Sequence, residues 1–541
     1  MSRFKIFIMY CVVVAISVIL LIGVSVSSSN LNTLVKEHHL HATGQVSNAP
    51  PLVTFTTVAL GSFRGILADL LWLRTIALQE EGNYFEMVQL ASWITMLQPN
   101  FTGATAYLAW NMAYNISVTC SDFADRWKWI QRGIELIRDE ALQYNKEDPL
   151  LYKELGWIYQ HKIGNIMDDA NLYYKNQIAL QMMRVFNGAE PDWDIWSRTP
   201  QTYSEFTRTL SKEQLDALNK ALTESGYAPF YKLSDHFRKE NKLPEAFTAL
   251  YKNKLELEQL ETFLRVLWLV DVYKLNPVLM HELNLEYGKL DWRLPESMAI
   301  YWATMGLKMT PSGKDISCER MISQSLKDAF MGGRLLMVDA KNYETILTVP
   351  NFNVTDSVLR VYREAYERNQ SSSFRSAMLN FMKDAVVIMY NFGKYTQANE
   401  LYGQLRKEEP GHSDYRGSLD AFVMKEWIED VRDANPKQAN DIISGLIFRS
   451  INFLVFGDID AAISYERRAR MVYNLYMREN ADVAGRTGLV PYNELKSSIT
   501  KSCLENFPKP LADILRAQLE AQKAREKEKE AEIKAASKVQ R

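Results

Sequence analysis

Apolar residues recur at intervals of three and four along most of this chain, and this spacing limits the possible fold more than any other feature. From about Thr57 to Lys501 one such run follows another, and the stretch from Leu67 to Leu73 is an example. Proline and glycine fall mostly between the runs, where helices end. A strand pattern is weak, with 346–354 as its best candidate. The sequence therefore predicts an all-α body over residues 57–505.

Length and charge restrict the possibilities further. A chain of 541 residues exceeds the roughly 250 to 300 residues at which one compact core stops growing, so we expect several domains or an elongated stack. Hydrophobic residues make up 47% of it, which indicates a folded protein. Lys and Arg number 63 against 65 Asp and Glu. Because this balance gives no broad positive field, we expect no binding to nucleic acid.

No set of residues points to a metal, a cofactor or a catalytic centre. Of four cysteines, one lies in the apolar N-terminal run and the others have no paired spacing. The histidines at 38, 39 and 41 lack companion ligands and are expected in a solvated linker rather than on a metal. No complete phosphate loop, zinc-protease helix or nucleophile elbow occurs. We therefore predict a protein that is not an enzyme, with no cofactor.

The N-terminus carries a membrane signal. Arg3 and Lys5 precede an uncharged run from Ile6 to Val26, whose 21 residues span about 30 Å as a helix. The alternative is a cleaved secretory signal, whose apolar region is normally about 7 to 15 residues long and ends at small residues. The serines near Val26 leave that alternative open. With the positive charges ahead of the span, the N-terminus is expected in the cytoplasm and the body outside, in the periplasm of a bacterium.

These signals divide the chain into four parts. We expect an anchor over residues 1–26, a linker over 27–56 that is rich in Ser, Asn and His, and the helical body over 57–505. A charged tail over 506–541 alternates Lys and Glu, which is typical of a solvated helix or a disordered extension.

Several segments share a spacing of small, aromatic and turn residues. The strongest match begins at a turn glycine and continues with packing residues and a terminal proline: Gly393, Tyr395, Ala398, Tyr402, Leu405 and Pro410. A second match has identical spacing, with bulkier residues at two positions: Gly82, Tyr84, Met87, Ala91, Ile94 and Pro99. A third is partial and has Glu466 at its aromatic position: Gly457, Ile459, Ala462 and Ala469.

Two further segments match in part. The run Tyr152, Leu155, Gly156, Tyr159 is similar to a first-helix signature of the form W-x-x-L-G-x-x-Y, and Ala170 with Tyr174 is similar to the later A-x-x-x-F, with extra residues between the two halves. The run Ala299, Ala303, Gly306, Pro311 has the gaps of a second helix.

Together these residues resemble the tetratricopeptide repeat family in a degenerate form. The resemblance implies an α-solenoid of stacked helix hairpins, anchored by the N-terminal transmembrane helix, in which each hairpin buries its apolar face against the next. The segments 187–253 and 314–370 follow no repeat. The alternative is an ordinary, irregular helical domain.

The expected function follows from the solenoid. Asn111 and Asn115 lie four residues apart on the first helix of the second pair, which would line the concave groove, so we predict that they bind a partner protein or peptide. Eight of twelve tryptophans lie between Trp72 and Trp196, and we expect them in the core. The main hypothesis is a scaffold for protein–protein interactions in the cell envelope. The alternative is an exported enzyme, or its regulatory subunit, with a site assembled by folding from Asp192, Asp194 and His236.

Overall fold

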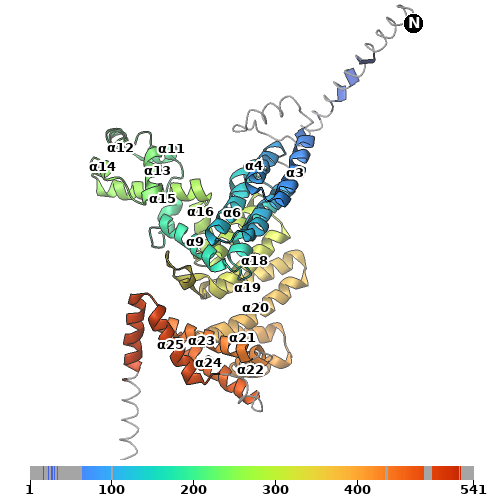
Figure 1. Cartoon of the computed structure of the whole chain (residues 1–541), viewed down its shortest axis with the longest axis vertical. Helices are drawn as coiled ribbons and strands as arrows, with labels where there is room; N and C mark the ends of the chain where they lie inside the picture. Colours follow the sequence, from blue (N-terminus) through green and yellow to red (C-terminus); the bar gives the residue numbers. More distant parts are fainter. Residues whose placement is uncertain are drawn as a thin grey trace, which may run out of the picture. The chain divides into compact units, whose positions relative to one another are not determined.

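The computed structural model describes residues 64–98, 101–432, 436–479, 490–522 and 524, together with isolated positions: Ile16, Ser17, Ile22, Gly23, Val26, Ser27, Asn30 and Thr33. The chain forms two compact units, Met1–Ala365 and Tyr366–Arg541 (Figure 1). Helices dominate both units, so the all-α prediction is confirmed.

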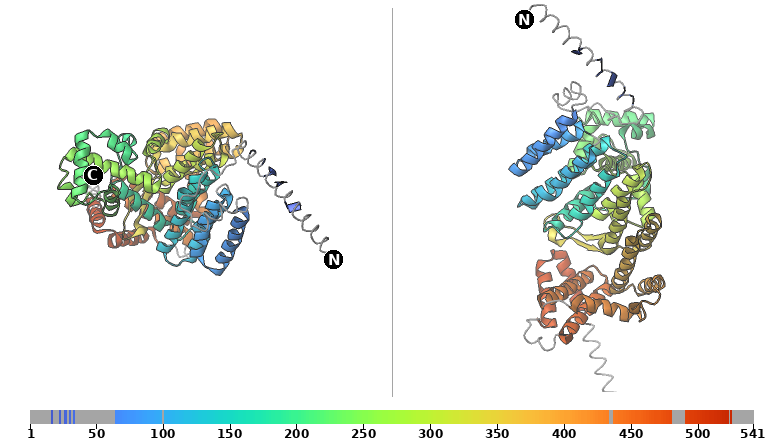
Figure 2. Two further views of the ribbon diagram at one scale, coloured as in Figure 1. Left: turned by 90° about the horizontal axis from the view of Figure 1, so that it is seen from above. Right: turned by 90° about the vertical axis from the view of Figure 1, so that its right-hand side faces the viewer.

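The first unit opens with helix hairpins that follow one another along the chain (Figure 2). Their helices are α3 (Arg64–Glu81), α4 (Tyr84–Leu97), α5 (Thr102–Asn111), α6 (Phe123–Glu135), α7 (Leu142–Tyr144), α8 (Pro149–Trp157) and α9 (Asn171–Val185). Three of them continue into π-helical turns, namely η2 (Met112–Ile116) after α5, η4 (Leu136–Ala141) after α6 and η5 (Ile158–Ile163) after α8. A 3₁₀ turn, η3 (Ser117–Thr119), follows η2. This architecture is compatible with a helical repeat.

Local sequence explains where these helices begin and end. Asp122 caps α6 by accepting a hydrogen bond from the Ala124 N–H, and Asp148 caps α8 in the same way ahead of Pro149. Between α3 and α4 the chain turns at Gly82, whose φ of 75° favours glycine. The turn glycine of the second repeat match therefore lies where the pattern predicts it.

Residues 187–253, which follow no repeat, fold into short helices: α10 (Trp193–Arg198), α11 (Tyr203–Thr209), α12 (Lys212–Glu224), α13 (Tyr231–Glu240) and α14 (Glu245–Thr248). The longer α15 (Lys254–Tyr273) and α16 (Pro277–Tyr287) come next. The rings of Phe206 and Phe263 stack with centroids 4.2 Å apart, and Phe230 also contacts Phe263. These aromatic contacts hold the short helices on α15.

Helices α17 (Pro295–Met309) and α18 (Ile316–Gly332) form a hairpin that packs on α8. The run from Ala299 to Gly306 is thus on the first helix of a hairpin, so its assignment to a second helix was wrong. Its small residues still allow α17 to approach α8 and α18 closely. A Cβ atom at Gly306 would lie 2.9 Å from both the Cys318 Sγ and the Tyr152 Cβ.

Replacing this glycine tests the contact between α8, α17 and α18. We expect Gly306→Ala to lower the free energy of unfolding by about 1 to 3 kcal/mol, because the added methyl group overpacks the interface. Gly103→Ala is the control, since nothing lies within 4 Å of the added Cβ and the change should stay below about 1 kcal/mol. Urea unfolding followed by circular dichroism measures both. Equal unfolding midpoints for the two variants would contradict the expectation.

A small antiparallel ribbon follows α18. Strand β1 (Arg334–Met337) pairs with β2 (Leu347–Val349), with Arg334 opposite Val349 and an irregularity after Leu335. The 346–354 candidate is therefore a strand in its first half only, and its second half holds the 3₁₀ turn η7 (Phe352–Val354). Another such turn, η6 (Tyr343–Thr345), precedes β2, and α19 (Thr355–Asn369) comes after η7.

The second unit contains the best repeat match. Its elements are α20 (Ser372–Asn391), α21 (Tyr395–Glu408), η8 (Ser413–Tyr415), α22 (Leu419–Arg432), α23 (Pro436–Val455), α24 (Ile459–Glu479), α25 (Tyr492–Asn506) and a further helix over 509–522. Helices α20 and α21 form a hairpin that turns at Gly393, where φ is 71°. Ala398 and Leu405 are fully buried. Tyr402 is buried as well, so three of the predicted packing positions lie in the core, whereas Tyr395 is 44% exposed.

The partial match at Gly457 is also a hairpin, formed by α23 and α24. The departure at Glu466 has a physical reason. The Glu466 carboxylate lies 2.5 Å from the Lys496 Nζ of α25, so the position expected to hold an aromatic residue makes an ion pair.

Among the helices that the structure describes, none is long and apolar enough to cross a lipid bilayer. The expected span over 6–26 and the linker over 27–56 lie outside the described residues, apart from isolated positions. Three of those positions, Ile16, Ile22 and Val26, are helical with exposed side chains.

Candidate binding face on the first helices

The two asparagines predicted to bind a partner lie on the first helix of the second hairpin, as expected. Asn111 is fully buried and donates a hydrogen bond of 2.5 Å to the Gln79 Oε1 of α3. Its own Oδ1 accepts a 2.8 Å hydrogen bond from the Asn115 Nδ2. Asn115 is exposed. The pair therefore forms one chain of amides, in which Asn111 positions Asn115 and only Asn115 is available to a ligand.

A row of aromatic rings runs beside these amides. We call it the aromatic ladder, and its members in order are Trp72, Tyr107, Trp110, Tyr114, His161 and Trp157. The distances between successive ring centroids are 5.5, 6.2, 5.5, 5.8 and 4.5 Å. The rings come from α3, from α5 with η2, and from α8 with η5, which are the first helices of three successive hairpins.

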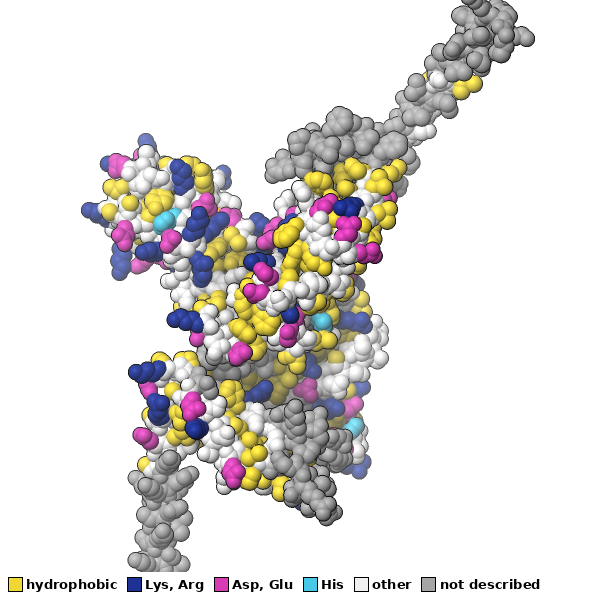
Figure 3. Space-filling model, in the orientation of Figure 1, with side chains coloured by type: hydrophobic (Ala, Val, Ile, Leu, Met, Phe, Trp, Pro, Cys, Tyr) yellow, Lys and Arg dark blue, Asp and Glu magenta, His cyan; other side chains and the backbone are white. Residues whose placement is uncertain are grey.

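The ladder is open to solvent along part of its length. Tyr107 is 43% exposed, and the other five rings are partly buried. Phe101, 49% exposed, lies 6.4 Å from Trp72 and extends the row. Hydrophobic side chains also reach the surface of the α3–α4 hairpin, which carries Trp72 (Figure 3). Leu70 and Phe85 of this hairpin are 58% and 86% exposed. Half-exposed rings of this kind can stack on apolar groups of a ligand.

Three residues of this face lie in π-helical turns. Tyr114 and Asn115 belong to η2, and His161 belongs to η5. A π turn takes one more residue than an α turn and is frequent at functional sites, because it changes the direction of the side chains that follow. These turns bring the Tyr114 and His161 rings to 5.8 Å across two helices.

The centre of the ladder is held by uncharged groups. The Tyr114 hydroxyl and the His161 Nδ1 are 3.2 Å apart, within hydrogen-bond distance. Burial, assisted by the nearby Glu154 charge, raises the pKa of Tyr114, so its hydroxyl stays protonated. Burial and the charge of Lys162 lower the pKa of His161, so its ring is neutral at pH 7. The hydrogen bond therefore joins two neutral groups at physiological pH.

Beneath the ladder lies a buried ion pair. The Lys162 side chain is only 4% exposed, and its Nζ lies 2.5 Å from the Asp168 Oδ2. The same Nζ lies 5.4 Å from the Tyr114 ring centre and 5.8 Å from that of Tyr174. Burial opposes ionisation of Asp168, but the hydrogen bonds from Lys162 and the Ala170 N–H and the positive charge of Lys162 together outweigh burial, so the pKa of Asp168 is lowered. This pair fixes the inner side of the Tyr114 ring.

The three residues of the enzyme alternative have separate partners. Asp192 caps α10 through the Ile195 N–H, and Asp194 lies 3.5 Å from His281. His236 lies 3.3 Å from the Tyr227 hydroxyl. Within the described ranges, no group of three or more His, Cys, Asp or Glu side chains is arranged to hold a metal ion.

The sequence did not predict the aromatic ladder, because the tryptophans were expected in the core. That expectation is right for Trp127, Trp193 and Trp196, which are buried. The signal that could have found the ladder is the spacing of its rings within each helix. Positions 107, 110 and 114, and likewise 157 and 161, lie three or four residues apart, so each set shares one helix face.

No model of a known protein family matches the chain, and no curated protein sequence is significantly similar to it.

Proposed function

We propose that this protein is a membrane-anchored scaffold of the tetratricopeptide type, which holds a partner protein by an extended segment laid along the aromatic ladder. The observation that carries the proposal is the single row of rings contributed by three successive hairpins. The proposed role is binding rather than catalysis.

An extended peptide suits the dimensions of the ladder. A strand rises about 3.3 Å per residue, so side chains on one of its faces are about 6.6 Å apart. Neighbouring rings of the ladder lie 4.5 to 6.2 Å apart, so successive apolar side chains can rest on successive rings. The exposed amide of Asn115 can then hydrogen-bond to the peptide backbone. A protein partner is favoured over nucleic acid because the formal net charge is −2.

The location of this scaffold is proposed from the N-terminus. The apolar run over 6–26 anchors the chain in a membrane, and Arg3 and Lys5 keep the short N-terminus in the cytoplasm. The helical body is then exported, to the periplasm if the source is a bacterium. There it would organise other proteins of the cell envelope.

The test compares crosslinked partners in the native membrane. We expect Tyr107→Ala with Asn115→Ala to reduce recovery of specific partners about tenfold, since both side chains are exposed and removing two central contacts commonly costs more than 1 kcal/mol. Asn111 is left intact because it is buried. Crosslinking followed by mass spectrometry measures recovery.

The matched control is Tyr231→Ala with Asn219→Ala, which removes the same side chains at exposed positions of α13 and α12 outside the ladder. It should recover the same partners as the unmodified protein. If no discrete partner is found, or if both double variants lose partners equally, the scaffold proposal fails.

A further inference from the structure

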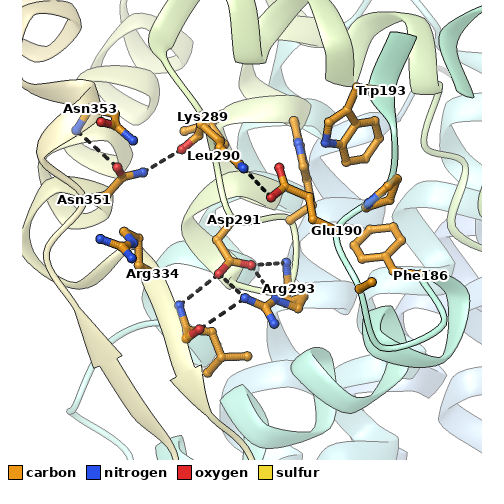
Figure 4. Close-up of a pocket in the computed structure, with 14 residues that line it drawn as sticks. Phe186, Glu190, Trp193, Lys289, Leu290, Asp291, Arg293, Arg334, Asn351 and Asn353 are labelled. Carbon is orange, nitrogen blue, oxygen red and sulfur yellow. Dashed lines mark hydrogen bonds and ion pairs between the residues drawn. The ribbon is translucent and has the colours of Figure 1, made fainter. Parts of the chain in front are cut away.

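A second site lies in the first unit, apart from the ladder. It is a cavity of about 420 Å³ between the segment after α9, the connection from α16 to α17, and the ribbon with η7 (Figure 4). Small-molecule sites usually have volumes of about 300 to 1,000 Å³, so the cavity is large enough for a small ligand. It shares no residue with the aromatic ladder.

The inner wall of the cavity is apolar and rigid. Phe186, Trp193, Leu290, Trp292 and Leu335 line it, and all five are more than nine-tenths buried. The Trp193 ring packs against both Phe186 and Trp292, with centroids 5.9 and 6.1 Å apart. This wall offers an aromatic surface to an apolar group.

One arginine is fixed at the cavity by a carboxylate. The Arg293 Nε and Nη2 donate to the two oxygens of Asp291 at 2.8 and 2.7 Å, and Nη2 also donates to the Leu335 carbonyl. The hydrogen bonds to Asp291 raise the pKa of Arg293. Asp291 itself accepts a hydrogen bond from the Leu335 N–H. In the described part of the chain, the Nη1 of this oriented guanidinium donates no hydrogen bond.

The outer edge of the cavity carries more positive than negative charge. Lys289 pairs with Glu190 at 2.5 Å, whereas Arg334 is exposed and has no ion-pair partner among the described residues. With Arg293 and Asp291, the lining holds three cations and two anions. Figure 4 shows Arg334 on one side of the cavity and the rings of Phe186 and Trp193 on the other.

We propose that this cavity binds a monocarboxylate that carries an apolar body, either a small organic acid or the carboxyl end of a polypeptide. The excess of one positive charge matches one negative charge, and guanidinium groups form strong, directional hydrogen bonds with carboxylates. The apolar body lies against Trp193 and Phe186, and the carboxylate contacts Arg334 and the Nη1 of Arg293. Asn351 is 1% exposed and held by the Lys289 carbonyl at 2.7 Å, which gives the cavity a fixed polar edge.

The test is a titration of the full chain followed by saturation-transfer NMR. The probes are N-acetyl-phenylalanine, its neutral amide, and an N-acetylated tetrapeptide of three alanines and a final phenylalanine, with either a free or an amidated carboxyl end. We expect the acids to bind at least about tenfold more tightly than their amides. Arg334→Gln should weaken the binding of the acids about tenfold, because it deletes a charge-assisted hydrogen bond. The substitution lies at an exposed position that folding does not require.

The control variant is Arg208→Gln, an exposed arginine on α11 outside the cavity, which should bind like the unmodified protein. If only the acetylated amino acid binds, the ligand is a small acid; if the tetrapeptide acid binds more tightly, it is a polypeptide end. Both outcomes support the site. Equal binding of acids and amides, unchanged binding by Arg334→Gln, or no binding of either acid would overturn it. The ladder variants leave this titration unaffected, so the two proposals fail separately.

Discussion

The substitution Asp168→Asn should lower the free energy of unfolding by about 3 to 5 kcal/mol. It removes the partner of Lys162, whose side chain is 4% exposed and would then be a buried, uncompensated cation. The substitution also removes the charge that faces Arg126, which lies 3.4 Å from the same carboxylate, whereas the Ala170 N–H can still donate to the amide oxygen of the asparagine. Urea unfolding followed by tryptophan fluorescence measures the change.

The neighbouring Asp169 provides the control. Its side chain is 69% exposed although it pairs with Arg126 at 2.5 Å, so Asp169→Asn should cost less than about 1 kcal/mol. A double variant, Lys162→Met with Asp168→Asn, should recover much of the lost stability, since an apolar side chain in place of a buried charge is often tolerated. Equal destabilisation by the two aspartate variants would show that the buried pair is not the cause.

Glu296→Gln should stabilise the protein in mildly alkaline solution. Glu296 is 8% exposed in the first turn of α17, and its Oε2 has no hydrogen-bond partner in the described part of the chain. Burial raises its pKa from 4.5 to about 7, and the charges of Asp328 and Asp291 add to the effect while Lys175 opposes it. The folded protein therefore holds a proton that the unfolded chain releases more easily.

The sign of the pH dependence follows from that raised pKa. The favourable contribution of protonated Glu296 to the stability of the folded protein is complete below about pH 4.5 and is lost as the pH rises through about 7. At pH 8 the variant should be more stable than the unmodified protein by on the order of 3 kcal/mol, whereas at pH 4.5 the two should be nearly equal.

Urea unfolding at pH 4.5 and pH 8 measures both differences. Glu258→Gln, at an exposed position on α15, should change neither. A difference between the Glu296 variant and the unmodified protein that is the same at both pH values would contradict the assignment.

The parts of the fold that depend on local sequence could be predicted. Gly82, Gly393 and Gly457 all have positive φ and all turn a hairpin, because this backbone conformation needs glycine wherever it occurs. Ala398 is buried where the repeat spacing places a small residue. Helical periodicity and turn glycines act over a few residues, so one sequence is sufficient to reveal them.

Contacts between distant segments could not be predicted. Helix α17 packs on α8 although more than a hundred residues separate them. The sequence of neither helix indicates that it contacts the other. The burial of Asn111 depends on Gln79 of another helix, and the cavity at Arg293 is assembled from four segments. The aromatic ladder could be predicted only in part. The sequence shows the spacing of the rings within each helix, but it does not show that the three helices align.

The π turns in η2 and η5 affect how the proposed binding face can change during evolution. Each residue of an α-helix turns the chain by about 100°, so one residue gained or lost within a regular helix rotates every side chain beyond it by that angle. A π turn takes up one extra residue within the turn itself, so the helix beyond it keeps its side-chain directions. Tyr114 and His161 lie within such turns. Gaining or losing one residue there can therefore re-aim these rings while both ends of a hairpin stay in place. Among descendants of this chain, we expect partner preference to follow helix length as well as side-chain identity.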